Sequence, residues 1–185
     1  MNIEYYVAPY EADAQLVYLL KIKKADVIIT EDSDLIIYGA SRICYKLDKS
    51  GDGGQEIKSE EFKEINNEQY NFSNFESLDD LINISILSGC DYLPRIKNLG
   101  FKTAYNQYIS NNKNIDNTIK SLKQSNKTIT LPTDYKEKFN KAFLTFKFQT
   151  VYCPIKKQQI SLNTKENSVY ENILNLYEDH NFMGK

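Results

Sequence analysis

The chain has 185 residues, of which 41% are hydrophobic and 26% are charged, a composition typical of a globular domain with a sizeable core. Its three cysteines include no C-x-x-C pair and its single histidine lies near the end, which argues against a disulfide framework, a zinc site and histidine-dependent nucleophilic catalysis. It carries no membrane-length apolar run and no secretory signal pattern. Any chemistry is therefore expected to rest on carboxylates.

The net charge of −2 hides an uneven distribution along the chain. Residues 1–91 hold 8 lysines and arginines against 18 acidic residues, whereas residues 92–185 hold 15 against 7. Such a division favours an acidic cluster beside a basic, anion-binding surface. An uneven scatter of ordinary surface charges explains the same counts.

Strand and helix patterns alternate at the start of the chain and become mainly helical later. β-branched and aromatic runs predict strands at 3–8, 25–30, 35–38 and 42–47, with a helix over 10–23 and a turn at 50–54. Helices are predicted at 59–65, 78–87, 101–110, 115–123 and 134–150, and an extended segment at 151–164. This order predicts an α/β fold class, with a partial parallel-sheet core followed by a helical region.

Acidic residues follow the ends of two predicted strands. Glu11 and Asp13 open the first helix, Asp32 and Asp34 stand in the string EDSD, and Asp91 follows a later apolar helix in SGCDYLP. Ligands of open α/β sheets bind beyond the carboxyl ends of the strands, so we expect the two pairs to face one crevice. Asp32 and Asp34 point to the same side if that segment is extended. Two positions in a regular helix differ by about 200°, so the first pair converges only at an irregular first turn.

Several carboxylates in one crevice need cations to offset their repulsion, and hard oxygen ligands select Mg²⁺ or Mn²⁺. Two such ions can activate a water molecule for phosphodiester hydrolysis. A plainer interpretation fits the same residues. In it, Glu11 and Asp13 cap a helix and EDSD is a solvated loop.

The string LPRIKNLGFKTAYNQY, residues 93–108, predicts two short helices around a turn and is called the basic hairpin here. Backbone N–H groups at the start of its second helix form a phosphate site, and the basic side chains supply counter-charge. An ordinary helical corner with solvated lysines is the alternative. The candidate DNA-binding residues are Arg95, Lys97, Asn98, Gly100, Lys102 and Thr103.

The strings YYVAPYEADAQLVYL, VIITEDSDLIIYG, ILSGCDYLPRIKNLGFKTAY, ITLPTDYKEKF and VYCPIKKQQISLN follow one another in this order. Together they resemble the flap endonuclease/XPG superfamily of 5′ nucleases, and within it the exonuclease 1 branch. The resemblance covers roughly residues 2–164, and the ordered combination of YEADAQ, EDSDL and GCDY is specific. It implies 5′→3′ cleavage of duplex DNA and removal of 5′ flaps, in mismatch repair and recombination.

The resemblance also assigns roles to residues. Glu11 and Asp13 would serve one ion of a two-magnesium site, and Asp32, Asp34 and Asp91 the other; Mn²⁺ is an alternative ion. The basic hairpin would be the family's helix-hairpin-helix element, which holds a potassium ion through the Ser88 hydroxyl and the carbonyls of Arg95 and Leu99.

Two departures from the family pattern affect these expectations. Asn98 stands where the family usually has the first of two hairpin glycines, and asparagine tolerates a left-handed backbone. The family's N-terminal portion, with its opening strand and two further metal-binding aspartates, has no counterpart here. We therefore expect a fragment or a half-protein that is nearly inactive alone, with a non-cutting DNA-binding module as the alternative function.

The resemblance completes the set of expectations. The predicted division is a nuclease core at 1–91, a helix-hairpin-helix region with a returning segment at 92–164, and a tail at 165–185. The expected partners are duplex DNA with a 5′ end, nick or flap, and mismatch-repair proteins. We expect nuclear localisation, no membrane partner and no small-molecule cofactor.

Overall fold

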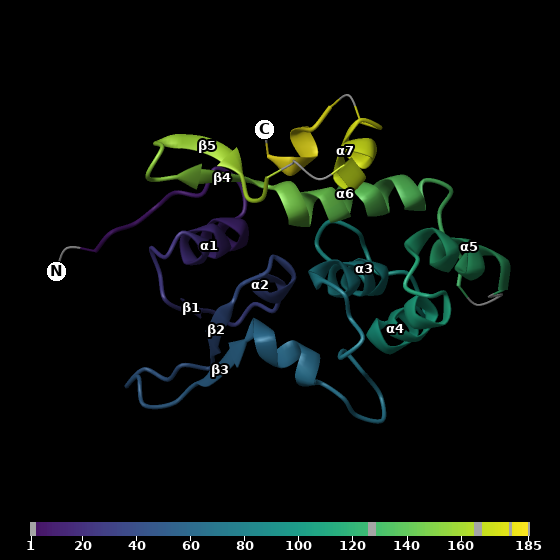
Figure 1. Cartoon of the computed structure of the whole chain (residues 1–185), viewed down its shortest axis with the longest axis horizontal. Helices are drawn as coiled ribbons and strands as arrows, with labels where there is room; N and C mark the ends of the chain where they lie inside the picture. Colours follow the sequence, from purple (N-terminus) through teal and green to yellow (C-terminus); the bar gives the residue numbers. More distant parts are fainter. Residues whose placement is uncertain (1–2, 126–128, 165–167, 178, 185) are drawn as a thin grey trace. The chain divides into compact units, whose positions relative to one another are not determined.

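The computed structural model describes residues 3–125, 129–164, 168–177 and 179–184 (Figure 1). Its backbone contacts divide the chain into two compact units. The first unit combines the residues up to Glu60 with those from Leu144 onward, and the second unit runs from Glu61 to Phe143. No helix in the described ranges is long and apolar enough to cross a lipid bilayer.

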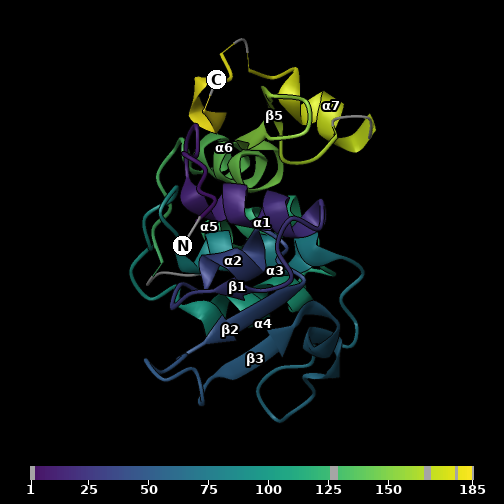
Figure 2. The ribbon, with the colours of Figure 1, turned by 90° about the vertical axis from the view of Figure 1, so that its left-hand side faces the viewer.

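A small mixed sheet organises the beginning of the first unit. Strand β1 (Ile28–Ile29) pairs in parallel with β2 (Arg42–Tyr45), and β2 pairs antiparallel with β3 (Gln55–Lys58). Helix α1 (Ala12–Lys21) packs against β1, and the three strands lie side by side in Figure 2. The α/β class and the parallel pairing are confirmed.

Two of the predicted strands are wrong. Residues 35–38 lie in a short helix, α2 (Asp34–Ile37), because the chain turns at once after β1 and buries Leu35 and Ile37 from a helical turn. Residues 3–8 are not in a strand; no described segment pairs with them, and Ile3, Tyr5 and Val7 are exposed. A β-pattern forms a strand only where a partner offers its backbone groups.

The later part of the first unit closes over α1. Strands β4 (Thr150–Cys153) and β5 (Gln158–Ser161) form an antiparallel hairpin. The buried Gln15 side chain accepts from the Tyr152 N–H at 2.7 Å and donates to the Tyr152 carbonyl at 3.0 Å. One amide therefore satisfies both backbone groups of a residue at the free edge of β4, which fixes α1 against that strand.

A second contact links α2 to the same part of the chain. The Tyr38 hydroxyl donates to Gln149 at 3.1 Å, and its ring meets Phe146 edge-on with centroids 5.0 Å apart. A further core of Leu144, Phe148, Leu174 and Met183 joins the end of α6 (Tyr135–Phe148) to α7 (Ser168–Leu174) and to the 3₁₀ helix Asn181–Met183.

The second unit is helical, as predicted. After the 3₁₀ helix Ser59–Glu64, which crosses from the first unit, come α3 (Leu78–Ser88), α4 (Phe101–Ser110), α5 (Ile115–Ser125) and α6 (Tyr135–Phe148). Helix α6 itself continues into the first unit. An aromatic cluster packs the connecting segment 66–75 against α4. Its members are Tyr70, Phe72, Phe75, Phe101 and Tyr105.

A buried polar network holds α3 to α4. The Tyr108 hydroxyl donates to Asp80 Oδ1 at 2.8 Å and accepts from Asn83 Nδ2 at 3.1 Å, while the Glu76 N–H donates to Asp80 Oδ2 at 2.7 Å. Asp80 is 6% exposed, so these donors offset the cost of burying its carboxylate. Burial raises the Tyr108 pKa, and its hydroxyl stays a donor.

Helix α3 ends at Gly89, whose φ is 102°. A Cβ at this position would lie 2.5 Å from the Arg95 Cβ and 2.7 Å from its Cα. The backbone after α3 and the backbone at Arg95 thus approach too closely for any side chain at position 89. This close approach sets the start of the basic hairpin.

Gly89→Ala should therefore destabilise the chain by more than the positive φ alone costs, which is about 1 kcal/mol. Gly51→Ala is the matched control, because Gly51 has a φ of 80° but no atom within 4 Å of the added methyl group. Urea unfolding should show a clearly lower free energy of unfolding for Gly89→Ala than for Gly51→Ala. Equal losses would contradict the close packing at Arg95.

Candidate metal centre and nucleic-acid interface

Residues 31–34, called the acidic loop here, follow β1 and are shaped by their own hydrogen bonds. The Asp32 N–H donates to Thr30 Oγ1 at 3.0 Å, and the Asp34 N–H donates to Asp32 Oδ1 at 2.9 Å. The second bond turns the chain into α2. The sequence predicted that Asp32 and Asp34 lie on one extended segment, and this prediction is wrong. Their proximity comes from a side chain-to-backbone turn instead.

Tyr45, at the end of β2, lies beside this loop. Its hydroxyl donates to the Asp32 carbonyl at 3.2 Å. The Tyr45 pKa is raised, mainly by burial of the phenol and to a smaller extent by the negative charges of Asp32, Asp34 and Glu31. Three carboxylates therefore act electrostatically on one phenol at the ends of two parallel strands, where α/β sheets bind their ligands.

Glu31 has a separate role in the loop. Its carboxylate accepts from the Lys46 N–H at 2.8 Å, which ties the loop to the residue after β2. Sequence reasoning missed both Glu31 and Tyr45. The parallel pairing of β1 with β2 is the signal that could have found them. With Ile29 opposite Cys44, the residues that follow the two strands come together.

The other acidic pair stands at the start of α1. Glu11 is the N-cap residue, with an extended backbone at φ −80° and ψ 139°, and its exposed side chain makes no capping hydrogen bond. Asp13 is half-buried in the first turn. The geometry therefore leaves the Glu11 carboxylate available for another role and gives no support to side-chain capping by Glu11.

Asp91 belongs to the second unit and is exposed in the turn that follows α3. The Cys90 N–H donates to the Leu93 carbonyl at 3.0 Å and the Leu93 N–H donates back at 3.1 Å, which closes this turn. Its convergence with the acidic residues of the first unit stays a prediction.

The oxygen donors of the first unit suit a hard cation but do not form a complete cage. Within the described ranges, no three acidic, histidine or cysteine side chains are grouped closely enough to hold a metal ion. The type of donor matches such a cation, because the candidate ligands are carboxylates, without histidine or thiolate, and carboxylate oxygens suit Mg²⁺ or Mn²⁺. Each pair by itself offers part of a coordination shell.

The basic hairpin brings its cations to the start of α4. Gly100 is the N-cap residue of this ten-residue helix. A Cβ on Gly100 would lie 2.8 Å from Arg95 Nη2, so the Arg95 guanidinium rests directly against the helix start. Lys102 is exposed in the first turn and Thr103 is half-buried there. The N-terminal N–H groups and the guanidinium thus lie close together, and anion binding by this corner stays a prediction.

Asn98 replaces a family glycine without loss of the turn. Its φ is 65°, in the left-handed region that the sequence analysis predicted. Leu99, which follows it, is fully buried, and its N–H donates to the Ile96 carbonyl at 3.1 Å. The turn is thus held by one buried side chain and one backbone hydrogen bond, with Lys97 exposed beside it.

The potassium ligands assigned by resemblance lie in the same part of the second unit. The Ser88 hydroxyl donates to the Ser85 carbonyl at 2.8 Å, which leaves its oxygen free to face a cation. The roles of the Arg95 and Leu99 carbonyls stay predictions.

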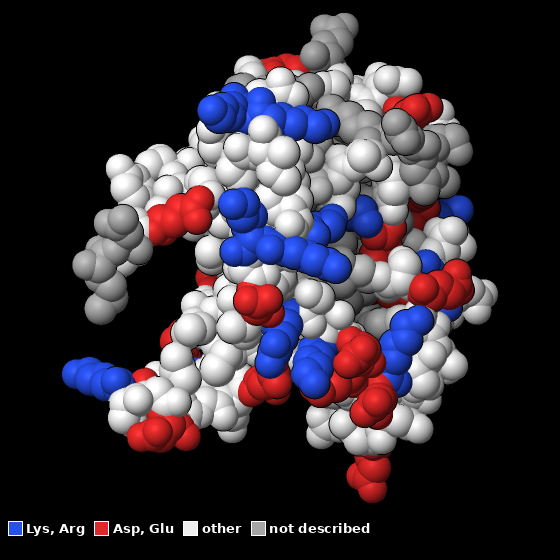
Figure 3. Space-filling model, turned by 60° about the vertical axis from the view of Figure 1, so that its left-hand side comes forward, with Lys and Arg blue, Asp and Glu red and all other residues white. Residues whose placement is uncertain are grey.

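The face drawn in Figure 3 does not show the charge division of the sequence as two separate fields. On the face drawn in Figure 3, basic and acidic side chains lie interspersed.

Comparison with known proteins places the chain in a class. Residues 2–91 match the family model of the XPG I-region. Over nearly its whole length the chain is similar to exonuclease 1. It is 43% identical over 183 residues to exonuclease 1 of Arabidopsis thaliana, covering 99% of the chain and 23% of that protein. It is 39% identical over 164 residues to exonuclease 1 of Oryza sativa, covering 88% of the chain and 18% of that protein.

Solved structures agree with this relationship. Flap endonuclease-1 from Methanococcus jannaschii is 28% identical, with a TM-score of 0.52 over 75% of this chain and 38% of that one. The catalytic core of Rad2, at 21% identity, shares the fold with a TM-score of 0.62 over 78% of this chain and 53% of that one. The fold is that of a 5′ nuclease core, and the chain spans about a fifth of the exonuclease 1 proteins it matches.

The left-handed turn at Asn98 can be tested by substitution. Asn98→Val should lower the free energy of unfolding by about 1–2 kcal/mol, because a β-branched side chain is strained at positive φ, whereas Asn98→Gly should be neutral or stabilising. Asn112→Val is the control, since Asn112 has a φ of 56° outside the basic hairpin. Both valine variants should lose stability in urea unfolding. Unchanged stability of Asn98→Val would contradict the turn.

Proposed function

We propose that this chain is the metal-binding and DNA-gripping part of a 5′→3′ DNA exonuclease that also removes 5′ flaps. The observation that carries the proposal is the ordered similarity to exonuclease 1 across the acidic loop, the Asp91 turn and the basic hairpin. The acidic loop and the hairpin corner supply the two groups of residues that such a reaction needs.

In this proposal the residues divide into two tasks. Asp32 and Asp34, together with Glu11, Asp13 and Asp91, would hold two Mg²⁺ ions. When bound, such ions lower the pKa of a water molecule and stabilise the leaving oxygen of a phosphodiester. Tyr45 donates to the Asp32 carbonyl and keeps the acidic loop in place, so we assign it a positioning role.

The basic hairpin would grip the backbone of duplex DNA without reading its bases. Arg95 and the N–H groups at the start of α4 would contact one phosphate, while Lys97 and Lys102 add exposed positive charge. A potassium ion held by Ser88 and by the Arg95 and Leu99 carbonyls would strengthen this corner. Nuclear localisation and mismatch-repair partners belong to the same proposal.

A second candidate function is a DNA-binding module that does not cut. It is favoured by the incomplete grouping of metal donors within the described part of the chain. In this case the 185-residue chain binds duplex DNA but releases no nucleotides.

A chimera separates the two functions. The matching region of the Arabidopsis thaliana exonuclease 1 is replaced by this chain, and release of nucleotides from 5′ ends is measured with Mg²⁺. The proposal predicts an active chimera, and an activity loss on the order of 100-fold, or about 3 kcal/mol of barrier, for Asp32→Asn or Asp91→Asn. Glu60→Gln, which removes the charge of an exposed 3₁₀-helix residue, is the control.

Both outcomes of this assay are informative. An inactive chimera that still binds duplex DNA would favour the binding module. Full activity of both aspartate variants would refute the assignment of these carboxylates.

DNA binding by the 185-residue chain tests the hairpin directly. The double variant Lys97→Ala/Lys102→Ala should reduce the slope of log affinity against log salt by up to two units, one for each lysine that contacts a phosphate. The control is Lys138→Ala/Lys141→Ala, because these α6 lysines already pair with Asp134 and Glu137. An equal effect of the two double variants would remove the hairpin from the interface.

A further inference from the structure

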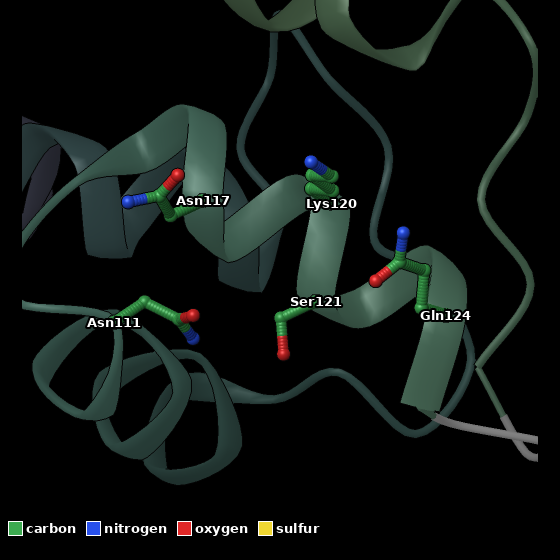
Figure 4. A pocket seen from close by; sticks show the side chains of 5 residues that line it. All are labelled: Asn111, Asn117, Lys120, Ser121 and Gln124. Carbon is green, nitrogen blue, oxygen red and sulfur yellow. The ribbon is translucent and has the colours of Figure 1, made fainter.

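A shallow polar pocket lies at the far end of α4, away from the basic hairpin. It has a volume of about 270 Å³ and is lined by Asn111, Asn117, Lys120, Ser121 and Gln124 (Figure 4). Four of these residues come from α5, and Asn111 is the residue that ends α4. Nothing in the proposed metal centre or hairpin uses this pocket.

The four α5 residues share one face of the helix, since their spacing of three and four positions repeats with the helical turn. The opposite face is buried: Ile119 and Leu122 pack there, together with Thr118, whose hydroxyl donates to the Asn114 carbonyl at 2.7 Å. This burial fixes the position of α5, and with it the direction in which the polar face points.

The pocket wall offers one positive charge and four neutral side chains that can both donate and accept hydrogen bonds, although Asn111 Nδ2 already donates to the Gln107 carbonyl at 2.7 Å. No ion pair within the described ranges involves Lys120. Asp116, the sole carboxylate of α5, pairs with Lys136 at 2.5 Å. Side-chain amides, a hydroxyl and an ammonium group suit an oxyanion that accepts several hydrogen bonds.

We propose that this pocket binds a backbone phosphate of the DNA held by the basic hairpin, as a second anchor contributed by Lys120 and Asn117. The inference rests on the proposed DNA-binding function and extends its footprint. Helix α4 has ten residues and is thus about 15 Å long, which separates the two anchors. At 3.4 Å of axial rise per nucleotide, this length corresponds to about four nucleotides of one strand.

The test compares Lys120→Ala with Lys123→Ala. Both changes remove one exposed lysine from α5, but Lys123 does not line the pocket. Duplex binding by the 185-residue chain is measured by fluorescence anisotropy between about 50 and 200 mM salt. Lys120→Ala should lower the slope of log affinity against log salt by about one unit. The fold-loss of affinity caused by this substitution should therefore be about threefold larger at about 50 mM salt than at about 200 mM. Lys123→Ala should leave the slope near that of the parent chain.

A second variant tests the pocket without removing a lysine. Asn117→Asp places a carboxylate in the pocket and should weaken binding more than Asn117→Ala does, because it repels a phosphate. Circular dichroism of each variant checks that α5 is intact.

The outcomes separate this inference from the function on which it rests. If the hairpin double variant loses slope while Lys120→Ala behaves like Lys123→Ala, the pocket is not an anchor and the DNA-binding function stands. If the parent chain shows no salt-dependent binding to duplex DNA, both fail. If the pocket variants instead lose binding to an acidic peptide and keep their affinity for DNA, the ligand class proposed here is wrong.

Discussion

The parallel pairing of β1 with β2 is the constraint on which the candidate metal centre depends. With Ile29 opposite Cys44, the chain leaves both strands at the same edge of the sheet, and the Thr30 N–H still donates to the Cys44 carbonyl at 3.1 Å. Thr30 Oγ1 then holds the Asp32 N–H, and Tyr45 reaches back to the Asp32 carbonyl. Two strand residues and their successors thus hold the backbone of the acidic loop in place.

The sequence predicted helices α1 and α3–α6, because these depend on local signals, but it missed α2 and α7. Apolar periodicity marked α3 and α4, and the glycine after α3 ends that helix at a positive φ. The two wrong strand predictions concern segments whose structure depends on contacts with the rest of the fold. Segment 3–8 has a strand pattern but lies without a pairing partner among the described residues, and residues 35–38 form a helix because the Asp32 carboxylate turns the chain.

The candidate site shows the same division between local and distant effects. Asn98 stands where the family has a glycine and tolerates the left-handed backbone that this turn requires, as the sequence indicated. The contributions of Tyr45 and Glu31 required knowledge of strand pairing, and the placement of the Arg95 guanidinium required the close approach at Gly89 and Gly100. Sequence reasoning identifies which chemistry is present, whereas tertiary contacts decide which groups meet. The polar pocket at the end of α4 was not foreseen, because it joins two helices through the turn between them.

Manganese binding tests the central claim most directly, because Mn²⁺ broadens the NMR signals of nearby backbone amides. The account predicts that Mn²⁺ added to the labelled chain first broadens the amides of the acidic loop 31–34 and of the start of α1. Excess Mg²⁺ should reverse this effect. The acidic pairs Glu60/Glu61 and Asp79/Asp80, to which no metal role is assigned, should stay sharp at the same Mn²⁺ concentration. Broadening centred on those pairs, or none at the acidic loop, would contradict the account.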